Sequence, residues 1–486
     1  MRRLFVTISL VLASMPLFAQ GSLRAGMVRD GGNAEIYART GQGGFRPGYA
    51  SSSQWFSGIS ASGRKTSRKT TFEGTFGFEQ MWGTKMLTSM LVNPGYFPVD
   101  VLELTPGDKS RQTYSFSGGI GTDLSPLWVL GGKVSFSASN YAKMKDLRYT
   151  NYALDISVEP SVGYRLGGGI IQLSYIHRKV SETIDAEQVG SATDQSYYAF
   201  FDKGMRYGAY EVWDGAGVHL NEAGVGLLPI VERSDGAGIE YVGKSFRASL
   251  RGLGTNGLVG EKGYNWFRFP GWTVEAKASG NMPMGTLRGN WSLSASVKAD
   301  RLDEAAMDRQ TVGGVTVPVI YAYDPVSDRL HSQVLAGFGV AGAKWRLRAT
   351  AAWMGWAEQS YLRYPYTDRL NFNMWRAGFS GDATFGIVDA GLTTGFRVGS
   401  SREQGLKTVG ELLPAEPPFR LQSDWDRKME YLGVPCLSLG ASASVRIPPV
   451  SGLRIIADLL WEHGFGVRLL PGSNRLTASV RVAYGF

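Results

Sequence analysis

The chain has 486 residues, 64 of them glycine, a formal net charge of +9 at pH 7 and a single cysteine, Cys436. This basic excess is too small to indicate a nucleic-acid partner, and one cysteine cannot build a disulfide framework. Beyond the N-terminal stretch there is no run of about 18 apolar residues, so we expect no transmembrane helix.

The N-terminus has the three parts of a secretory signal peptide. Arg2 and Arg3 give a basic start, residues 4–12 form a short apolar core, and Ala19 is a small residue at a plausible cleavage point. A spanning helix would need about 20 apolar residues. We therefore expect a signal peptide at residues 1–19 and one exported domain over residues 20–486. Export also argues against a nucleic-acid partner.

A two-residue periodicity recurs along the mature chain. In one segment, Trp291 and Leu293 fall on one face while Ser292 and Ser294 fall on the other, which is the period of a strand with one apolar face. The aromatic-rich and glycine-rich composition fits outer-membrane barrels, whose strands are apolar only toward lipid. The clearest such segments are 72–79, 154–162, 291–298, 345–353, 437–446 and 453–462.

The connections between these segments alternate in length. The short ones are 62–69, 123–126, 166–168, 282–286, 341–344, 387–389 and 448–451, and the long ones are 84–110, 185–238, 303–329, 401–428 and 463–474. Short periplasmic turns and long outer loops are typical of outer-membrane barrels, and a sheet in lipid must close on itself. We predict an all-β, transmembrane antiparallel outer-membrane β-barrel of about 16 strands, within about 14 to 18. The range reflects residues 241–269, which can be read as one strand or three.

The C-terminal segment has the strictest alternation. Leu476, Tyr484 and Phe486 share one face, and Arg475 and Arg481 share the other. A strand of this kind that ends on phenylalanine is similar to the closing strand of bacterial outer-membrane barrels, which the barrel-assembly machinery reads. Tyr484 and Phe486 are therefore the expected assembly signal. The alternative is an ordinary edge strand that ends in Phe.

Several short stretches carry a family resemblance. They are YAKMKDLR at 141–148 followed by Asn151, EPSVGY at 159–164, GGN at 31–33 and FRP at 45–47. With them the whole chain resembles a family of outer-membrane barrels of unknown function found in Bacteroidota-type envelopes. The resemblance implies the barrel fold and the membrane, and it brings no catalytic residues.

Charged residues divide between the two halves of the chain. If the apolar face of each strand meets lipid, the C-terminal third sends mostly arginines into the lumen and the N-terminal strands send mostly carboxylates. A basic wall would favour anionic solutes in a pore, whereas cross-strand salt bridges would only stiffen the wall. Both interpretations remain open, and the candidates are Arg346, Arg348, Arg397, Arg446, Arg454, Arg475, Arg481, Glu73, Glu79, Asp155 and Glu159.

A barrel of this size is wide enough for an aqueous channel, and the small polar residues of the lumen face cannot fill it. Water, a folded loop or a partner must occupy it. Residues 185–238 are the best candidate for an inserted loop, because this segment is long and mixes aromatic residues with Asp, Glu and Gly. The alternative is a surface loop packed over the outer rim.

Catalysis and metal binding have little support. A catalytic triad needs Ser, His and a carboxylate in contact, and His463 beside Glu462 is the least implausible base among four histidines. The cysteine, histidine and acidic spacings of common metal sites are absent, so we expect no metal or other cofactor. A 22-stranded energised receptor with a plug domain would need far more residues.

Three functions follow in order of preference. The first is a passive channel for small, preferably anionic solutes, or an accessory transport barrel that works with other envelope proteins. The second is a surface protein whose loops bind a partner while the barrel serves as an anchor. The third, less expected, is a membrane-embedded hydrolase. In each case the strands span the outer membrane, contact its lipid and leave the C-terminus in the periplasm.

Overall fold

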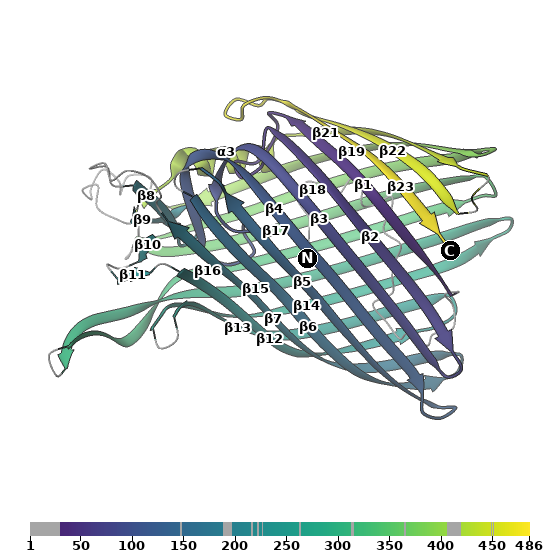
Figure 1. The fold of residues 1–486 in the computed structure, drawn as a ribbon, viewed down its shortest axis with the longest axis horizontal. Coiled ribbons are helices and arrows are strands. Elements are labelled where there is room, and N and C mark those ends of the chain that lie inside the picture. Colours follow the sequence, from purple (N-terminus) through teal and green to yellow (C-terminus); the bar gives the residue numbers. More distant parts are fainter. Residues whose placement is uncertain are drawn as a thin grey trace.

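The chain forms a closed antiparallel barrel of 18 strands in the computed structural model (Figure 1). The structure describes residues 30–145, 148–187, 197–214, 217–220, 223–225, 227–261, 264–312, 315–363, 366–405, 419–448, 450 and 452–486. The predicted signal peptide at residues 1–19 lies outside the described residues.

The barrel strands follow one another around the wall in chain order. They are β1 (Gly31–Gly43), β2 (Ser53–Ser67), β3 (Thr70–Ser89), β4 (Asp100–Asp123), β5 (Trp128–Lys143), β6 (Arg148–Leu166), β7 (Gly169–Glu187), β12 (Leu227–Val242), β13 (Phe246–Glu261), β14 (Tyr264–Met284), β15 (Leu287–Val312), β16 (Val315–Ala341), β17 (Trp345–Arg363), β18 (Tyr366–Phe385), β19 (Val388–Gln404), β21 (Cys436–Arg446), β22 (Leu453–Gly464) and β23 (Asn474–Gly485).

The first and last strands close the barrel. β1 pairs with β23 over its whole length, with Ile36 opposite Val482. At the seam, the Gly32 N–H donates to the Phe486 carbonyl at 2.8 Å and the Phe486 N–H donates to the Gly32 carbonyl at 3.0 Å. Closure leaves no unpaired strand edge, which a sheet in lipid requires. The predicted fold class is confirmed, with the strand count at the upper end of the expected range.

The outer face of the wall is apolar. Ile36 and Trp375 are 65% and 62% exposed, and many other large apolar side chains on alternate strand positions are exposed as well. Arg475 and Thr477 of the last strand are buried, whereas Leu476 between them is exposed. Apolar residues therefore point out and polar residues point in, as the alternation predicted and as a lipid environment demands.

The connections at one end of the barrel are all short, as expected. The other end carries the long connections, but also the short ones between β5 and β6, β13 and β14, β15 and β16, and β17 and β18. We call the two ends the turn end, where the C-terminus lies, and the loop end (Figure 1). Residues 241–269 contain the end of β12, all of β13 and the start of β14. The prediction of a long loop at 303–329 is wrong, because β15 and β16 stay paired there, with Ala305 opposite Tyr323 and Thr311 opposite Thr316. A hairpin that extends past the lipid-facing part of the wall needs no apolar face. Its sequence therefore lacks the two-residue alternation from which the other strands were predicted.

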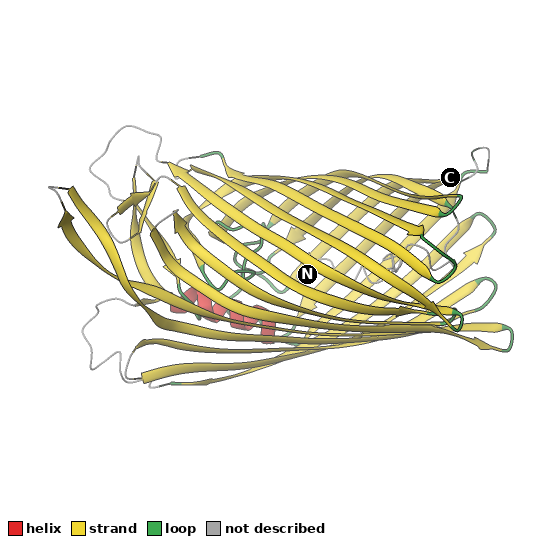
Figure 2. Ribbon diagram, turned by 90° about the horizontal axis from the view of Figure 1, so that it is seen from below, coloured by secondary structure: helices red, strands yellow, loops and turns green. Residues whose placement is uncertain are grey.

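Further elements lie inside the loop end. They are β8 (Tyr197–Asp202), β9 (Tyr207–Asp214), β10 (Gly217–Leu220), β11 (Ala223–Val225), β20 (Phe419–Arg420) and α3 (Gln422–Gly433). β8 pairs with the start of β4, and β20 pairs with β9. Figure 2 shows α3 within the outline of the barrel, and it packs against β19. No helix in the described part of the chain is long and apolar enough to span a membrane.

Candidate functional site

The connection between β3 and β4 folds into the lumen and reaches the opposite wall. At its tip, the Tyr96 hydroxyl donates to Glu232 Oε1 on β12 at 2.5 Å. Arg329 on β16 donates to the Phe97 carbonyl at 2.7 Å and to the Tyr96 carbonyl at 3.2 Å. The other edge of the same guanidinium binds Asp300 on β15 at 2.7 and 2.8 Å. One arginine thus links the inserted segment to the wall through charge-assisted bonds.

Two cations also flank the Tyr96 ring. Lys298 Nζ lies 4.3 Å from its centroid and the Arg178 guanidinium lies 5.8 Å from it. Arg178 is near the middle of β7, so the segment reaches about half-way down the lumen. A cation held against an aromatic face in a desolvated place is attracted to it, and the tip is therefore fixed by several independent contacts.

The first loop cluster joins the inserted segments to the wall through apolar packing. Phe200 and Phe201 of β8 are fully buried, and Phe201 stacks on Phe267 with a centroid distance of 5.1 Å. Because these lumen-facing side chains exclude water, protein fills this part of the lumen. The cluster includes Met86, Met90, Leu91, Val92, Phe97, Val99, Val101, Tyr149, Ile184, Phe201, Ile230, Phe267, Phe269, Leu302 and Val326.

The second loop cluster forms around α3. Trp425 is 1% exposed, and its ring lies 5.8 Å from that of Trp356 on β17 at an angle of 64°. Residues from the β1–β2 and β22–β23 connections complete the packing. The cluster comprises Phe45, Met205, Tyr207, Trp356, Leu370, Phe372, Met374, Trp425, Tyr431, Leu432, Cys436 and Leu470.

Arg206 connects the two clusters. Its guanidinium lies 2.7 Å from Asp424 of α3, 2.5 Å from Asp202 of β8 and 3.6 Å from Asp100 of β4. Arg206 and Met205 both have positive φ, 63° and 51°, a conformation that costs a non-glycine residue about 1–2 kcal/mol. Glu358 accepts a hydrogen bond from the Met205 N–H at 2.9 Å and holds this turn in place. We call residues 86–102, the β8–β9 hairpin and α3 together the loop plug.

Lys428 of α3 is a half-buried cation of the loop plug. Its amine lies 4.3 Å from the centroid of the Trp356 ring and 5.3 Å from that of Trp425. Burial, together with the nearby positive charge of Arg206, lowers the pKa of Lys428 to about 8. The ammonium form is thus disfavoured in the packed state.

The predicted arginines are spread along the wall from β17 to β23. At the turn end, Arg346 pairs with Asp382 at 2.9 Å and Arg446 pairs with Asp389 at 3.5 Å. Arg454 is exposed at the same rim. Among the described residues Arg454 has no carboxylate within 4 Å, so this part of the rim carries more cations than these two ion pairs neutralise.

Farther into the barrel lie the other four arginines of this wall. Arg481 binds Asp458 at 2.9 Å, and Arg348, on β17, sits opposite Ser380 of β18. Arg397 and Arg475 are buried in the loop-end half. The structure thus does not bring the seven arginines together at one point, and distributes them along the full height of the wall instead.

The predicted carboxylates have partners on their own side of the barrel. Asp155 binds Arg178 at 3.1 and 3.0 Å, and Glu159 binds Arg251 at 3.3 and 3.0 Å. Glu79 accepts a bond from the Tyr37 hydroxyl at 2.9 Å, and Arg39 and Arg111 lie 3.7 and 3.6 Å from it. These carboxylates therefore pair with local cations.

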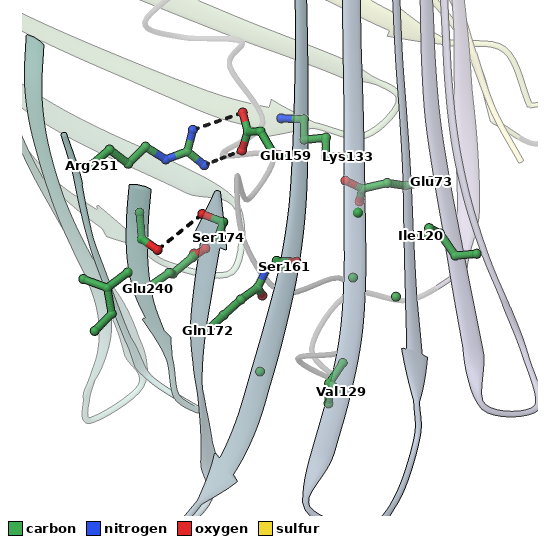
Figure 3. A pocket seen from close by; sticks show the side chains of 16 residues that line it. Glu73, Ile120, Val129, Lys133, Glu159, Ser161, Gln172, Ser174, Glu240 and Arg251 are labelled. Carbon is green, nitrogen blue, oxygen red and sulfur yellow. Dashed lines mark hydrogen bonds and ion pairs between the residues drawn. The ribbon is translucent and has the colours of Figure 1, made fainter. Parts of the chain in front are cut away.

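Glu73 lies in a polar recess of the wall toward the turn end (Figure 3). Glu159, Glu240, Lys133 and Arg251 line the same recess from β5, β6, β12 and β13. Glycine and serine fill the positions between them, so the wall is lined by small side chains there. Unlike the loop-end half, this part of the wall is polar.

Sequence reasoning missed several residues of the loop plug. Asp300, Arg329, Arg206 and Lys428 were assigned no role, although the first three are buried charges and the fourth is half-buried. Residues 84–110 were predicted only as a long loop, and their apolar run from Met90 onward was the available signal for insertion. Residues 185–238, the predicted inserted loop, contribute β8 and β9.

His463 does not form a catalytic constellation. Its Nδ1 lies 2.9 Å from the Asn474 amide oxygen, and its ring stacks on Trp461. In the part of the chain that the structure describes, no group of three or more His, Cys, Asp or Glu side chains is placed to hold a metal ion.

Comparisons with known proteins give the following matches. A family model described as a family of unknown function matches residues 25–486. No curated protein matches the sequence. Three solved structures are similar in fold: a mutant of the ferric enterobactin receptor PfeA from Pseudomonas aeruginosa (8% identity, TM-score 0.42, 94% of this chain and 81% of that chain), the outer membrane transporter YddB from Escherichia coli (8%, 0.45, 93% and 81%), and OccAB3 from Acinetobacter baumannii (10%, 0.35, 94% and 99%).

Proposed function

Because the chain belongs to DUF6850, a family of unknown function, we propose its role from its own geometry: a gated outer-membrane transport barrel for small anionic solutes, with the loop plug as the gate. The observation that carries this proposal is the arginine excess on the lumen face of β17–β23. This wall has seven predicted arginines, of which Arg346, Arg446 and Arg481 pair with aspartates of the same wall, so the arginines outnumber the carboxylates that bind them. On the other wall, Glu79, Asp155 and Glu159 lie beside cations of their own.

The position of the arginines supports selection for anions. They run from the exposed rim, at Arg346 and Arg454, through Arg348 and Arg481 to the buried Arg397. Fixed positive charge along a pore raises the local concentration of anions and repels cations. The three carboxylates of the recess, Glu73, Glu159 and Glu240, lie near three cations, Lys133, Arg251 and Arg247, so the recess does not cancel this field.

The loop plug supports gating. Its contacts are apolar clusters and buried ion pairs on the loop-end side, while the turn-end side has a polar wall. A solute that crosses the barrel must displace part of this packing. We infer that a ligand or an envelope partner shifts the plug, and that the passage is narrow without it.

The topology follows from the same proposal. The loop end faces the outside and the turn end, with the C-terminus, faces the periplasm, as in barrels with short periplasmic turns. Tyr484 and Phe486 are exposed on the lipid side, where the assembly machinery could read them. The Bacteroidota-type envelope stays a prediction of the resemblance.

Ion selectivity in planar bilayers tests the anion preference. We would measure reversal potentials across a KCl gradient for a barrel whose plug is weakened by Arg206→Ala. Replacing Arg346 and Arg348 together with glutamine should lower the chloride preference, and the effect should shrink at 1 M salt, where the Debye length falls to about 3 Å. Lys65→Gln is the matched control, since Lys65 is an exposed cation on the outer face of the turn end. Unchanged selectivity in the double variant would contradict the proposal.

A second function is favoured by one feature. The β15–β16 hairpin projects beyond the rest of the wall at the loop end (Figure 1), and Tyr321 on it is 67% exposed. An exposed two-stranded arm suits binding of a surface partner. Shortening the hairpin should then abolish that binding while ion conduction is unchanged.

A further inference from the structure

Four arginines toward the loop end, three in the wall and one in the β1–β2 connection, have no carboxylate partner among the described residues. We call Arg46, Arg376, Arg397 and Arg475 the arginine cluster. Arg397 is 8% exposed and Arg475 is 3% exposed. Among the described residues, none of the four has a carboxylate within 4 Å, and buried guanidinium nitrogens of each have no hydrogen-bond acceptor: Arg46 Nε, Arg376 Nε, Arg397 Nη2, and Arg475 Nε and Nη2.

The strand register places two of these charges side by side. Arg376 of β18 lies directly opposite Arg397 of β19, and like charges at such positions destabilise a sheet. Glu462 of β22 lies opposite Arg475 of β23. Glu462 interacts electrostatically with Arg376, Arg397 and Arg475, so these three cations share one carboxylate at longer range.

The other nearby carboxylates are already engaged. Asp424 binds Arg206 at 2.7 Å and Asp458 binds Arg481 at 2.9 Å. Glu430 of α3 accepts hydrogen bonds at 2.7 to 2.9 Å from the backbone N–H groups of residues 468–470. The protein itself therefore offers the cluster no further negative charge in the described part of the chain.

Neighbouring groups hold the guanidinium groups in position. The Arg397 guanidinium lies 4.6 Å from the Tyr431 ring centroid and 5.3 Å from that of Phe45. Arg475 donates to the Ser51 carbonyl at 3.3 Å. The aromatic rings thus hold Arg397, and the Ser51 carbonyl holds Arg475. Each of the two guanidinium groups still has N–H groups without a hydrogen-bond acceptor.

We propose that the arginine cluster, near α3 and contributed by β18, β19, β23 and the β1–β2 connection, is a binding site for a small oxyanion such as phosphate. A guanidinium cannot lose its proton in a protein, so burial is not relieved by neutralisation. Water would accept hydrogen bonds from the free N–H groups but carries no net charge. An oxyanion supplies both the hydrogen-bond acceptors and the negative charge, and two of its oxygens match the two parallel N–H groups of a guanidinium.

The proposal concerns equilibrium binding and does not depend on conduction. The cluster continues the line of arginines that begins at the rim. Arg348 of β17 lies opposite Ser380 of β18, and Ser380 is four residues nearer the turn end than Arg376 of the same strand. If the barrel conducts no ions, the site can still be occupied, so the two proposals fail separately.

Isothermal titration calorimetry on the full-length protein in detergent tests the site. Sodium phosphate, sodium sulfate and sodium succinate would be titrated separately at constant ionic strength, with sodium chloride as the reference anion. We expect saturable binding of phosphate, and Arg397→Gln and Arg475→Gln should each raise its Kd about tenfold or more, because each removes a charge-assisted contact. Arg165→Gln, which removes a guanidinium at the turn end, should leave the Kd unchanged.

Folding of each variant is checked on gels, where a folded barrel migrates differently before and after heating. If Arg397→Gln fails to fold, Arg397→Lys keeps the charge but loses the planar fork, and it should still weaken binding. Binding of sulfate or succinate that is lost in the same variants supports the oxyanion class. The proposal is overturned if none of the three anions binds more tightly than chloride, or if Arg165→Gln weakens binding as much as Arg397→Gln.

Discussion

Single charged side chains determine how the inside of this barrel is organised. Arg206 contacts three aspartates from three different segments, and Arg329 connects the Tyr96–Phe97 tip to the far wall. Buried ion pairs of this kind contribute little net stability, but removal of one partner leaves uncompensated charge in a desolvated place. The loop plug is therefore sensitive to substitutions at a few positions.

Arg206→Ala should loosen the loop plug without opening the barrel wall. The change leaves Asp202 and Asp424 without their guanidinium partner, at a cost of about 3–5 kcal/mol. We expect faster hydrogen exchange in β8, β9 and α3, with the wall strands unchanged, by mass spectrometry. Arg165→Ala, which breaks an ion pair at the turn end, is the control. Equal protection of the plug in wild type and Arg206→Ala would refute its role.

Lys428 should make the stability of the plug depend on pH. Its pKa is about 8 in the folded chain against an ordinary value of 10.5. Between these values the unfolded chain binds more protons, so folding becomes more favourable as pH rises from about 8 to 10.5. The wild type should gain denaturant resistance relative to Lys428→Met over this range. A constant difference between the two proteins from pH 7 to pH 11 would mean that the amine titrates normally.

At the scale of the strands, period-two alternation is the strongest information in the sequence. It predicted which residues face lipid, because each strand must hide one face from hydrocarbon. It failed for the paired extensions of β15 and β16, where no bilayer imposes two faces. It also could not predict α3 or the β8–β9 hairpin, whose positions depend on contacts with distant strands.

The register of the wall can be tested by cysteine labelling. Leu293 is exposed on the lipid side, whereas Lys298 reaches Glu232 at 3.1 Å inside the lumen. A slip of one residue would place Lys298 in hydrocarbon at a cost of about 2–4 kcal/mol. Cysteines at 291 and 293 should react with lipid-soluble reagents, and those at 292 and 294 with small water-soluble ones. The reverse pattern would show that the register is wrong.

For the molecule as a whole, the sequence indicated the charge asymmetry but not the pairing. The arginines from Arg346 to Arg481 could be assigned to the lumen face from the two-residue alternation alone, because they alternate with apolar residues in their strands. Which cations neutralise Asp155 and Glu159 depends on which strands are neighbours and on side-chain reach, and neither can be read from periodicity. The same limit explains why the sequence left three possible occupants of the lumen, namely water, a folded loop or a partner.

The two halves of the lumen differ in a way that suits a gate. Apolar clusters and buried ion pairs fill the loop end, and a polar, partly basic wall lines the turn end. A permanently open channel would not need a packed loop end. A simple membrane anchor would not need a polar, partly basic wall at the turn end.

Single-channel recording in planar bilayers tests the gated barrel most directly. The wild-type protein and Arg206→Ala would be compared at the same salt concentration and voltage, with Arg165→Ala as the control for reconstitution. We expect the wild type and the control to pass little current and Arg206→Ala to show large, anion-preferring openings. A large steady current through the wild type, or no current through Arg206→Ala after correct assembly, would contradict the account.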